Sequence, residues 1–511
     1  MKSEKKAHLM NPKKLVLFAL LVFVVLLISC DNETVVNNEK SENSIVDDFE
    51  TPEDKQDIAQ IKDSLPEGLD FGGTVISIIT RSEGIPADDA NYEFYAESET
   101  GDIVNDAIYR RNKTVEDRLN VNLNVIQGPG WQSYSQALTL IRSSVKAGDQ
   151  AYDIVAGWSA QISPLAVEGL FANLHEMPYL DLGKPWWNQT IVNDLTVAKK
   201  LPFIAGDINL TILGNSIVVY YNNKIPEEYG LTENIYDVVF DGKWTIDYIA
   251  ETAKNVQKDL NGDGVMDEFD QYGAAWPVVN YNDAFMNSSA IKIIVIGGDN
   301  VPVLSTDTER LAGLVDKVFN FLYNSPGVYA IVRWELEDVM DVAMFNNNQA
   351  LMVPGYLCFA YTHYRETEFD YSILPYPKYD ETQEYQTPVQ NGLSLLCVPY
   401  NSDKKETIGA FMEAAACESY KNVSPVYFDT AMKVKYARDE VSAKMLDIIR
   451  RGINLNFASI YDPNIGSPVL LMREMAGYGP LKGNNFASWW EKNEPRISKA
   501  LEKLVEKMQD N

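Results

Sequence analysis

Histidine is scarce in this sequence. The 511-residue chain has three histidines, His8, His175 and His363, and they are far apart along it. A histidine-rich metal centre needs several imidazoles close together, and a nucleophilic triad usually needs one as its base. The scarcity excludes the first kind of site and argues against the second.

Cysteine is almost as scarce, with four residues in the whole chain. Cys358, Cys397 and Cys417 have mainly apolar neighbours and are expected to be small buried residues. A disulfide scaffold would show a dense, even set of cysteines. At most one bridge is therefore possible, and the sequence does not decide whether it forms.

Positive charge is also in short supply. The chain has 44 Lys and Arg against 73 Asp and Glu, a net charge of −29. Without residues 1–29 the net charge is about −33. Such a surface repels nucleic acid and anionic lipid headgroups, so neither is an expected partner.

A transmembrane-length apolar run is missing too. The run from Leu15 to Ile28 has 14 residues, fewer than the roughly 20 that span a bilayer. It follows Lys13 and Lys14, and a basic start before a short apolar core is typical of a secretory signal. We expect residues 1–29 to be that signal, with translation starting at Met1 or Met10.

The end of the signal, Leu27-Ile28-Ser29-Cys30, resembles the lipobox of bacterial lipoproteins. The resemblance implies cleavage before Cys30 and lipidation of Cys30, which would anchor the protein on the extracytoplasmic face of the cell membrane. An ordinary signal with a chance cysteine is the alternative. Residues 30–69 are acidic and poor in aromatics, which predicts a disordered tether.

Strand and helix patterns alternate after the tether. β-Branched or alternating segments predict strands over 74–80, 121–125 and 152–156, and apolar spacing predicts helices over 102–119 and 134–147. This order is typical of a parallel α/β sheet, in which ligands bind beyond the carboxyl ends of the strands. Trp158 follows the third of these strands. Further strands are predicted over 216–222, 350–353, 371–374 and 393–399, and further helices after Thr245 and over 310–323, 338–347, 405–418, 441–450 and 495–509.

Several segments in this order resemble the extracellular solute-binding proteins of bacterial ABC transporters, especially the maltodextrin-binding branch. They are YDIVAG at 152–157, EGLFANL at 168–174, VYYNNK at 219–224, ALMVPG at 350–355 and VPYNS at 398–402. The resemblance implies a type II periplasmic-binding-protein-like α/β fold with two hinged lobes and a central cleft. It also implies a monomer without enzymatic activity that binds a carbohydrate, an oligosaccharide in particular, and delivers it to the permease subunits of an ABC transporter.

The same resemblance suggests lobe boundaries. The first lobe is expected over 70–208 and 390–450, and the second over 209–389 and 451–511. Crossovers between the lobes are expected near 206–210, 387–391 and 451–456. The end of the chain beyond Asn454 diverges from the family pattern.

A twelve-residue acidic segment, DLNGDGVMDEFD at 259–270, fits the EF-hand calcium loop. Side-chain oxygens fall at positions 1, 3, 5, 9 and 12, a backbone carbonyl at position 7 and glycine at position 6. A structural Ca²⁺ is the expected cofactor, and a plain acidic turn is the alternative. The predicted ligands are Asp259, Asn261, Asp263, Val265 through its carbonyl, Asp267 and Asp270.

A sugar site needs aromatic platforms for ring faces and planar polar groups for hydroxyls. Trp158 is the strongest candidate, because an aromatic at this place stacks on a sugar ring in the relatives it resembles. The other candidates are chosen by their places near the expected cleft and crossovers or, for Trp131, in a Gly-Pro-Gly-Trp loop. They are Tyr356, Trp276, Asn391, Trp131 and Asp207.

Three other functions remain open at this stage. The protein could bind a peptide or another solute that is not a sugar, or it could be a surface adhesin with a rigid calcium loop. It could also be a tethered glycoside hydrolase, which would need a pair of carboxylates. With so many acidic residues, such pairs are expected by chance and favour nothing.

Overall fold

The computed structural model describes residues 60–82, 90–305, 307–332, 339–433, 440–475 and 485–510. Contacts divide the chain into two units, Met1–Lys55 and Gln56–Asn511, and the architecture below is that of the second unit. The predicted signal, Cys30 and most of the predicted tether lie outside the described residues. Across the described ranges, no helix is both long and apolar enough to cross a bilayer.

The last part of the predicted tether is ordered, which corrects the expectation of disorder up to residue 69. Leu65 is buried, and Asp63 accepts a hydrogen bond from Nη2 of Arg118 at 2.8 Å. This segment lies against the helix that carries Arg118, so the folded part of the chain begins before the first strand.

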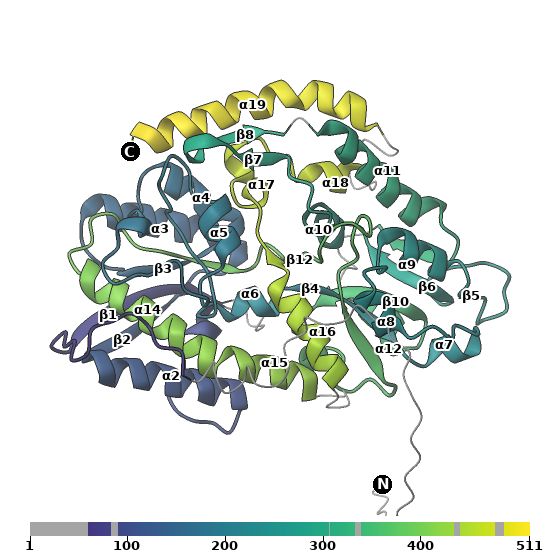
Figure 1. Cartoon of the computed structure of the whole chain (residues 1–511), viewed down its shortest axis with the longest axis horizontal. Helices are drawn as coiled ribbons and strands as arrows, with labels where there is room; N and C mark the ends of the chain where they lie inside the picture. The colour runs from purple at the N-terminus through teal and green to yellow at the C-terminus, as the bar shows by residue number, and fades with distance from the viewer. Residues whose placement is uncertain are drawn as a thin grey trace, which may run out of the picture. The chain divides into compact units, whose positions relative to one another are not determined.

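The first sheet has the strand order β13-β3-β1-β2 (Figure 1). It contains β1 (Thr74–Arg81), β2 (Val121–Gly128), β3 (Ile154–Trp158) and β13 (Ser394–Cys397). The predicted parallel pairing is confirmed, since β1 runs parallel to both β2 and β3, and β13 is antiparallel to β3. The third strand extends two residues farther than predicted, so Trp158 is its last residue and pairs with Ser394.

Helices surround this sheet. The predicted helix over 102–119 is α2 (Ile103–Leu119). Asp102 caps its start, because the Asp102 carboxylate accepts a hydrogen bond from Val104 N–H at 3.0 Å. The others are α3 (Tyr134–Ala147), α4 (Ser159–Val167), α5 (Gln189–Asp194), α14 (Lys405–Asn422) and α15 (Ser424–Lys433).

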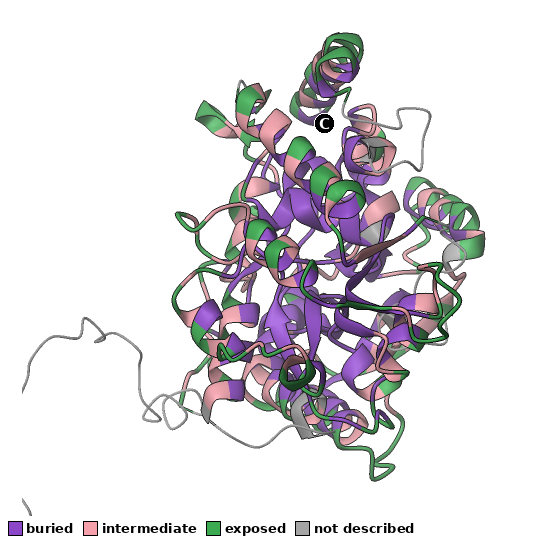
Figure 2. Ribbon diagram, turned by 90° about the vertical axis from the view of Figure 1, so that its right-hand side faces the viewer, coloured by how far each residue is buried: buried purple, intermediate pink, exposed green. Residues whose placement is uncertain are grey.

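The second sheet has the strand order β11-β4-β10-β6-β5, and β9 also pairs with β6. It contains β4 (Ile217–Asn222), β5 (Gln257–Lys258), β6 (Gln271–Pro277), β9 (Val328–Ile331), β10 (Ala350–Tyr356) and β11 (Tyr371–Pro375). Every residue of β4, β6, β10 and β11 is buried, as expected of strands covered on both faces. Figure 2 shows this contrast between buried strands and the partly exposed helices around them.

The helices of this part are α7 (Ile225–Glu228), α8 (Ile235–Phe240), α9 (Ile246–Ala253), α10 (Asn280–Ser288), α11 (Thr308–Asn324), α12 (Met340–Asn346) and α13 (Phe359–Thr362). The predicted start at Thr245 is confirmed, because its hydroxyl accepts a hydrogen bond from Tyr248 N–H at 3.2 Å. A small hairpin, β7 (Ile294–Ile296) with β8 (Pro302–Leu304), stands apart from the sheet.

Three segments pass side by side between the two sheets. β12 (Thr387–Pro388) pairs in parallel with β14 (Ile453–Asn454), and Val389 bridges Ser216, which immediately precedes β4. The first of these segments includes α6 (Leu210–Gly214). α16 (Glu440–Arg451) precedes β14 and packs against β11, so this helix lies next to the second sheet. The lobe boundaries themselves stay a prediction.

The C-terminal part of the chain contacts elements around both sheets. It contains α17 (Phe457–Ile460), α18 (Leu470–Met475) and α19 (Phe486–Asp510). α17 and α19 contact α4, whereas α18 contacts α10 and α11, and α19 also lies along β8 (Figure 1).

A buried carboxyl group connects two of the crossing segments. Glu93, at the end of the short helix η2 (Ala90–Glu93), is fully buried. Its Oε1 accepts hydrogen bonds from the backbone N–H of Thr211 at 2.8 Å and from the Thr211 hydroxyl, and its Oε2 accepts one from the Ser394 hydroxyl. Burial raises the pKa of Glu93 to about 7, against the lowering effect of these hydrogen bonds and of the Arg81 charge.

The charged groups around Glu93 come from two other elements. The Arg81 guanidinium, at the end of β1, donates to the carbonyl of Gly392. The Arg111 guanidinium, on α2, donates from Nη2 to the backbone carbonyl of Glu93 at 2.6 Å. Both cations favour the ionised carboxylate, and burial outweighs them.

Glu93→Gln should therefore change how stability depends on pH. A carboxyl group whose pKa is higher in the folded than in the unfolded state stabilises fully below the unfolded value. That contribution is lost as pH rises from about 4.5 to about 7. The wild type should lose a few kcal/mol relative to the variant across this window. Chemical denaturation at a series of pH values measures it, and parallel profiles for the two proteins would contradict the assignment.

Candidate functional site

The carboxyl end of β3 brings together residues that are far apart in the sequence. Trp158 is partly exposed there, and its backbone N–H donates to the hydroxyl of Tyr134 at 2.8 Å. The two rings meet edge to face with centroids 5.2 Å apart. The guanidinium of Arg81 lies 5.9 Å from the centre of the Trp158 ring. Trp158 is thus held in place from two sides while part of it stays accessible.

Asn391 lies at the same end of the sheet as Trp158, beside the start of α4. The hydroxyl of Ser159, at the start of α4, donates to the backbone carbonyl of Asn391 at 2.7 Å. Arg81 and Tyr134 were not predicted. Arg81 ends β1, beside β3, so its position at the carboxyl end of a parallel strand could have marked it as a candidate.

A polar cavity of about 270 Å³ lies where the crossing segments meet α4 and α10. Asn391 and the α4 residues Ala160 and Gln161 line it, whereas Trp158 is not among its lining residues. Amide, carboxyl, hydroxyl and guanidinium groups line it together with a few apolar side chains. The polar residues are Gln161, Asp283, Asn287, Gln390, Asn391, Ser459, Asp462, Ser467 and Arg473.

The strongest electrostatic feature of this cavity is an ion pair. Nε of Arg473, on α18, lies 2.6 Å from Oδ2 of Asp283, on α10. Burial raises the pKa of Asp283 to about 6, although the Arg473 charge opposes this. Asp462 is also largely buried, which raises its pKa, and one of its oxygens accepts the Val469 N–H at 3.1 Å. Both carboxyl groups therefore serve bonds within the protein.

Two predicted aromatic ligand contacts are core residues. Trp276 is fully buried and packs against Phe285, Phe321 and Tyr376, contrary to its predicted place at the cleft. It lies on β6, whose side chains are covered on both faces. Tyr356 is also buried, at 7% exposure, and stacks on Tyr281 with ring centroids 5.5 Å apart.

Asp207 is not among the residues that line the cavity. Asp207 forms an ion pair with Arg450 of α16 at 2.9 Å, and burial raises the pKa of Asp207. The Arg450 guanidinium in turn lies over the rings of Tyr420 and Phe428. Asp207 therefore joins the first crossing segment to α16. Trp131 begins the short helix η3 (Trp131–Ser133), and its side chain lies outside the described part of the chain.

The predicted calcium loop forms a compact turn. Gly262 and Gly264 have positive φ angles of 75° and 79°, and both donate their N–H groups to the Asp259 carboxylate. Asp270 is buried and accepts the N–H groups of Asp267 and Leu260 at 2.9 Å, which keep the pKa of its carboxyl below the usual value. In the described residues no three His, Cys, Asp or Glu side chains come close enough to hold a metal.

The cysteines form no disulfide among the described residues. Cys358, Cys397 and Cys417 are buried thiols, as the sequence predicted. Burial raises the pKa of Cys397 and Cys417, so these thiols stay protonated at neutral pH.

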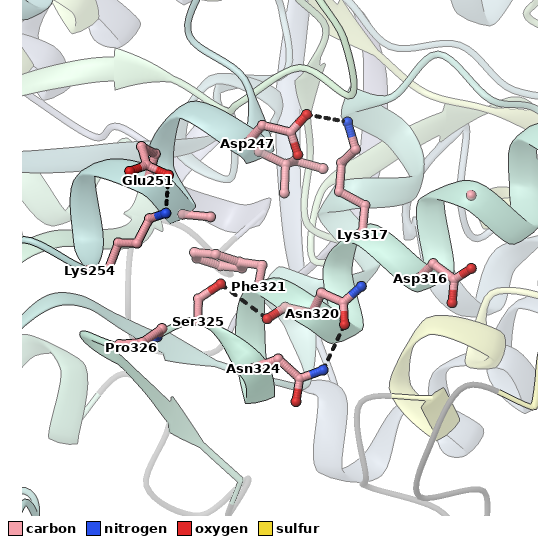
Figure 3. A pocket seen from close by; sticks show the side chains of 13 residues that line it. Asp247, Glu251, Lys254, Asp316, Lys317, Asn320, Phe321, Asn324, Ser325 and Pro326 are labelled. Atoms are coloured by element: carbon pink, nitrogen blue, oxygen red, sulfur yellow. Dashed lines mark hydrogen bonds and ion pairs between the residues drawn. The ribbon is translucent and has the colours of Figure 1, made fainter.

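A second, larger hollow of about 540 Å³ lies on the surface between α9 and α11 (Figure 3). Two pairs of its charged groups form ion pairs: Lys317 with Asp247 at 2.7 Å, and Lys254 with Glu251. Asn324 likewise donates to the side chain of Asn320 at 2.7 Å. This hollow lies apart from the crossing segments and from Trp158, so the smaller polar cavity is the better candidate site.

Comparisons with known proteins agree with this geometry. Residues 112–420 match the family described as bacterial extracellular solute-binding protein. No curated protein matches the chain.

Many solved structures match the fold. M. tuberculosis UspC matches with a TM-score of 0.54 and 12% identity over 83% of this chain and 100% of that chain. The GacH receptor of Streptomyces glaucescens matches at 0.51 and 12% over 85% and 99%. The galacto-N-biose/lacto-N-biose I-binding protein of Bifidobacterium longum matches at 0.52 and 13% over 84% and 98%.

These matches confirm the expected α/β class and the type II periplasmic-binding-protein-like fold. The family match covers more than half of the chain and includes the end of β3 and the segment that leads into β13. The chain belongs to the family of bacterial extracellular solute-binding proteins.

Proposed function

We propose that this protein is the substrate-binding component of an ABC import system, that it binds a carbohydrate beside the crossing segments, and that it delivers the carbohydrate to a membrane permease. The observation that carries this proposal is the polar cavity lined by Ala160 and Gln161, which follow the partly exposed Trp158 in the sequence. Two solved relatives support it: GacH was solved with acarbose, and the B. longum protein with lacto-N-biose.

The chemistry of the site suits a sugar. Gln161 and Asn391 offer amide groups that both donate and accept hydrogen bonds, which matches the hydroxyl groups of a sugar. The indole of Trp158, at the end of the strand that precedes α4, offers a rigid apolar face that is partly exposed. Asp283 and Asp462 are engaged in bonds within the protein, which favours binding over hydrolysis by a carboxylate pair.

Trp158→Ala should weaken sugar binding by roughly ten- to a hundredfold, because the loss of one aromatic platform costs about 1–3 kcal/mol. A thermal-shift screen of mono- and oligosaccharides would first identify the ligand, and calorimetry would then compare the two proteins. The melting temperature without ligand should change little. Trp276→Ala is the control, since removal of a core indole should cost about 3–5 kcal/mol of stability. Full affinity in the Trp158 variant would remove Trp158 from the site.

We also propose that the loop at 259–270 holds one structural Ca²⁺. Support comes from its residue pattern, its two glycines with positive φ and the ionised state favoured for Asp270. Binding would replace the hydrogen bonds from backbone N–H groups to Asp259 and Asp270 with coordination to the ion.

Calcium should therefore raise the melting temperature of the wild type, and EDTA should lower it again. Asp263→Ala should abolish this response, because Asp263 is a predicted ligand at position 5 of the loop. Differential scanning fluorimetry with and without calcium measures both effects. A melting temperature that ignores calcium in both proteins would leave the loop as a turn.

The family is extracellular by its description. We propose in addition that a lipid on Cys30 anchors the protein to the membrane. Two or three acyl chains bind a membrane firmly, since each buried CH₂ contributes about 0.8 kcal/mol.

Cys30→Ala should release the protein from membranes or leave it as an uncleaved precursor. Fractionation of cells, with metabolic labelling by a fatty acid, distinguishes the two results. Unchanged labelling and membrane attachment of the variant would show that the anchor lies elsewhere.

A further inference from the structure

Residues 456–475, called the C-terminal wall here, lie beyond the family match at 112–420. They include α17, the short helix η7 (Asp462–Asn464) and α18. η7 and α17 contact α4, which follows Trp158, while α18 contacts α10 and α11 of the other sheet. The C-terminal wall therefore stands between the two sets of helices that border the cavity.

Internal bonds fix the C-terminal wall in place. The side chain of Asn456 accepts the Ser459 N–H at 2.9 Å, at the start of α17, and donates to Oδ1 of Asn287 on α10. Phe457 and Tyr461 are buried and stack with ring centroids 4.4 Å apart. Because its aromatic side chains are packed in the core, the C-terminal wall has a fixed position in the fold.

The C-terminal wall supplies one side of the cavity. Ser459, Asp462, Ser467 and Arg473 come from the C-terminal wall, and Gln161 and Asn391 line the same cavity from other segments. The cavity volume is about 270 Å³, just below the ~300–1,000 Å³ typical of sites for drug-sized ligands. A disaccharide has about as many non-hydrogen atoms as a drug-sized ligand, and a tetrasaccharide has about twice as many.

The Asp283–Arg473 ion pair joins the C-terminal wall to α10 at the cavity surface. Oδ2 of Asp283 is occupied by Arg473, whereas Oδ1 receives no hydrogen bond from any described residue. A buried carboxylate oxygen is a strong acceptor, and leaving it unsatisfied is costly. Both side chains of the pair line the cavity and stay partly exposed, 21% for Arg473 and 16% for Asp283, so a ligand hydroxyl in the cavity can contact the pair.

We propose that the C-terminal wall limits the ligand to about two sugar rings, and that the Asp283–Arg473 pair positions one of those rings. This proposal rests on the proposed carbohydrate function. It adds residues outside the matched family region to the determinants of specificity.

The test uses the full chain and calorimetry with two length series, maltose to maltotetraose and cellobiose to cellotetraose. In the series that binds, the disaccharide should bind at least tenfold more tightly than the tetrasaccharide. A tetrasaccharide that binds equally or more tightly would overturn the length limit and leave the carbohydrate function intact. Binding by neither series, nor by any sugar of the screen, would overturn the function, and the length limit would fall with it.

A charge-neutral double variant, Asp283→Asn with Arg473→Gln, tests the ion pair without leaving one charge buried alone. It should lose at least tenfold in disaccharide affinity. The matched control is Asp247→Asn with Lys317→Gln, an ion pair of the surface hollow, which should bind normally. Unchanged affinity in the first variant would overturn the role of the pair. If that variant does not fold, the length series on the unaltered chain still decides the proposal.

Discussion

The buried carboxyl group of Glu93 is the interaction on which the arrangement of the crossing segments depends. Taking a carboxylate out of water costs several kcal/mol unless hydrogen bonds replace its hydration. Here Thr211 and Ser394 provide the donors. Thr211 lies in the segment that leads into β4, and Ser394 begins β13. The Glu93 side chain thus joins the segment that leads into β4 to the start of β13.

That constraint extends to the candidate site. The segment that ends at Ser394 also carries Asn391, whose carbonyl accepts the Ser159 hydroxyl at the start of α4. Arg81 donates to Gly392 in the same segment and lies over Trp158. The Trp158 indole is therefore held by a network that begins at the crossing segments, so a change in those segments would reach it directly.

The aromatic residues divide between two roles for a physical reason. The second sheet is covered on both faces, so its large side chains pack with one another: Trp276 on β6 with Phe285 and Tyr376, and Tyr356 on β10 with Tyr281. Trp158 is the last residue of the inner strand β3, at its carboxyl end, and stays partly exposed there. A place near the predicted cleft did not predict that a side chain is exposed, because the helices that cover a strand come from segments far away in the sequence.

The sequence by itself determined the local elements and their class. β-Branched runs and helical spacing predicted the strands and helices of the first sheet, and their alternation predicted its parallel pairing, because these patterns depend on neighbours within a few residues. The order of short segments was enough to indicate the family. Only the tertiary structure decided that Trp276 and Tyr356 belong to the core, that Asp207 pairs with Arg450, and that Asp283 meets Arg473 at the cavity. Asp283 and Arg473 are separated by 190 residues, and a contact at such a distance follows from the packing of whole elements, which no local pattern records.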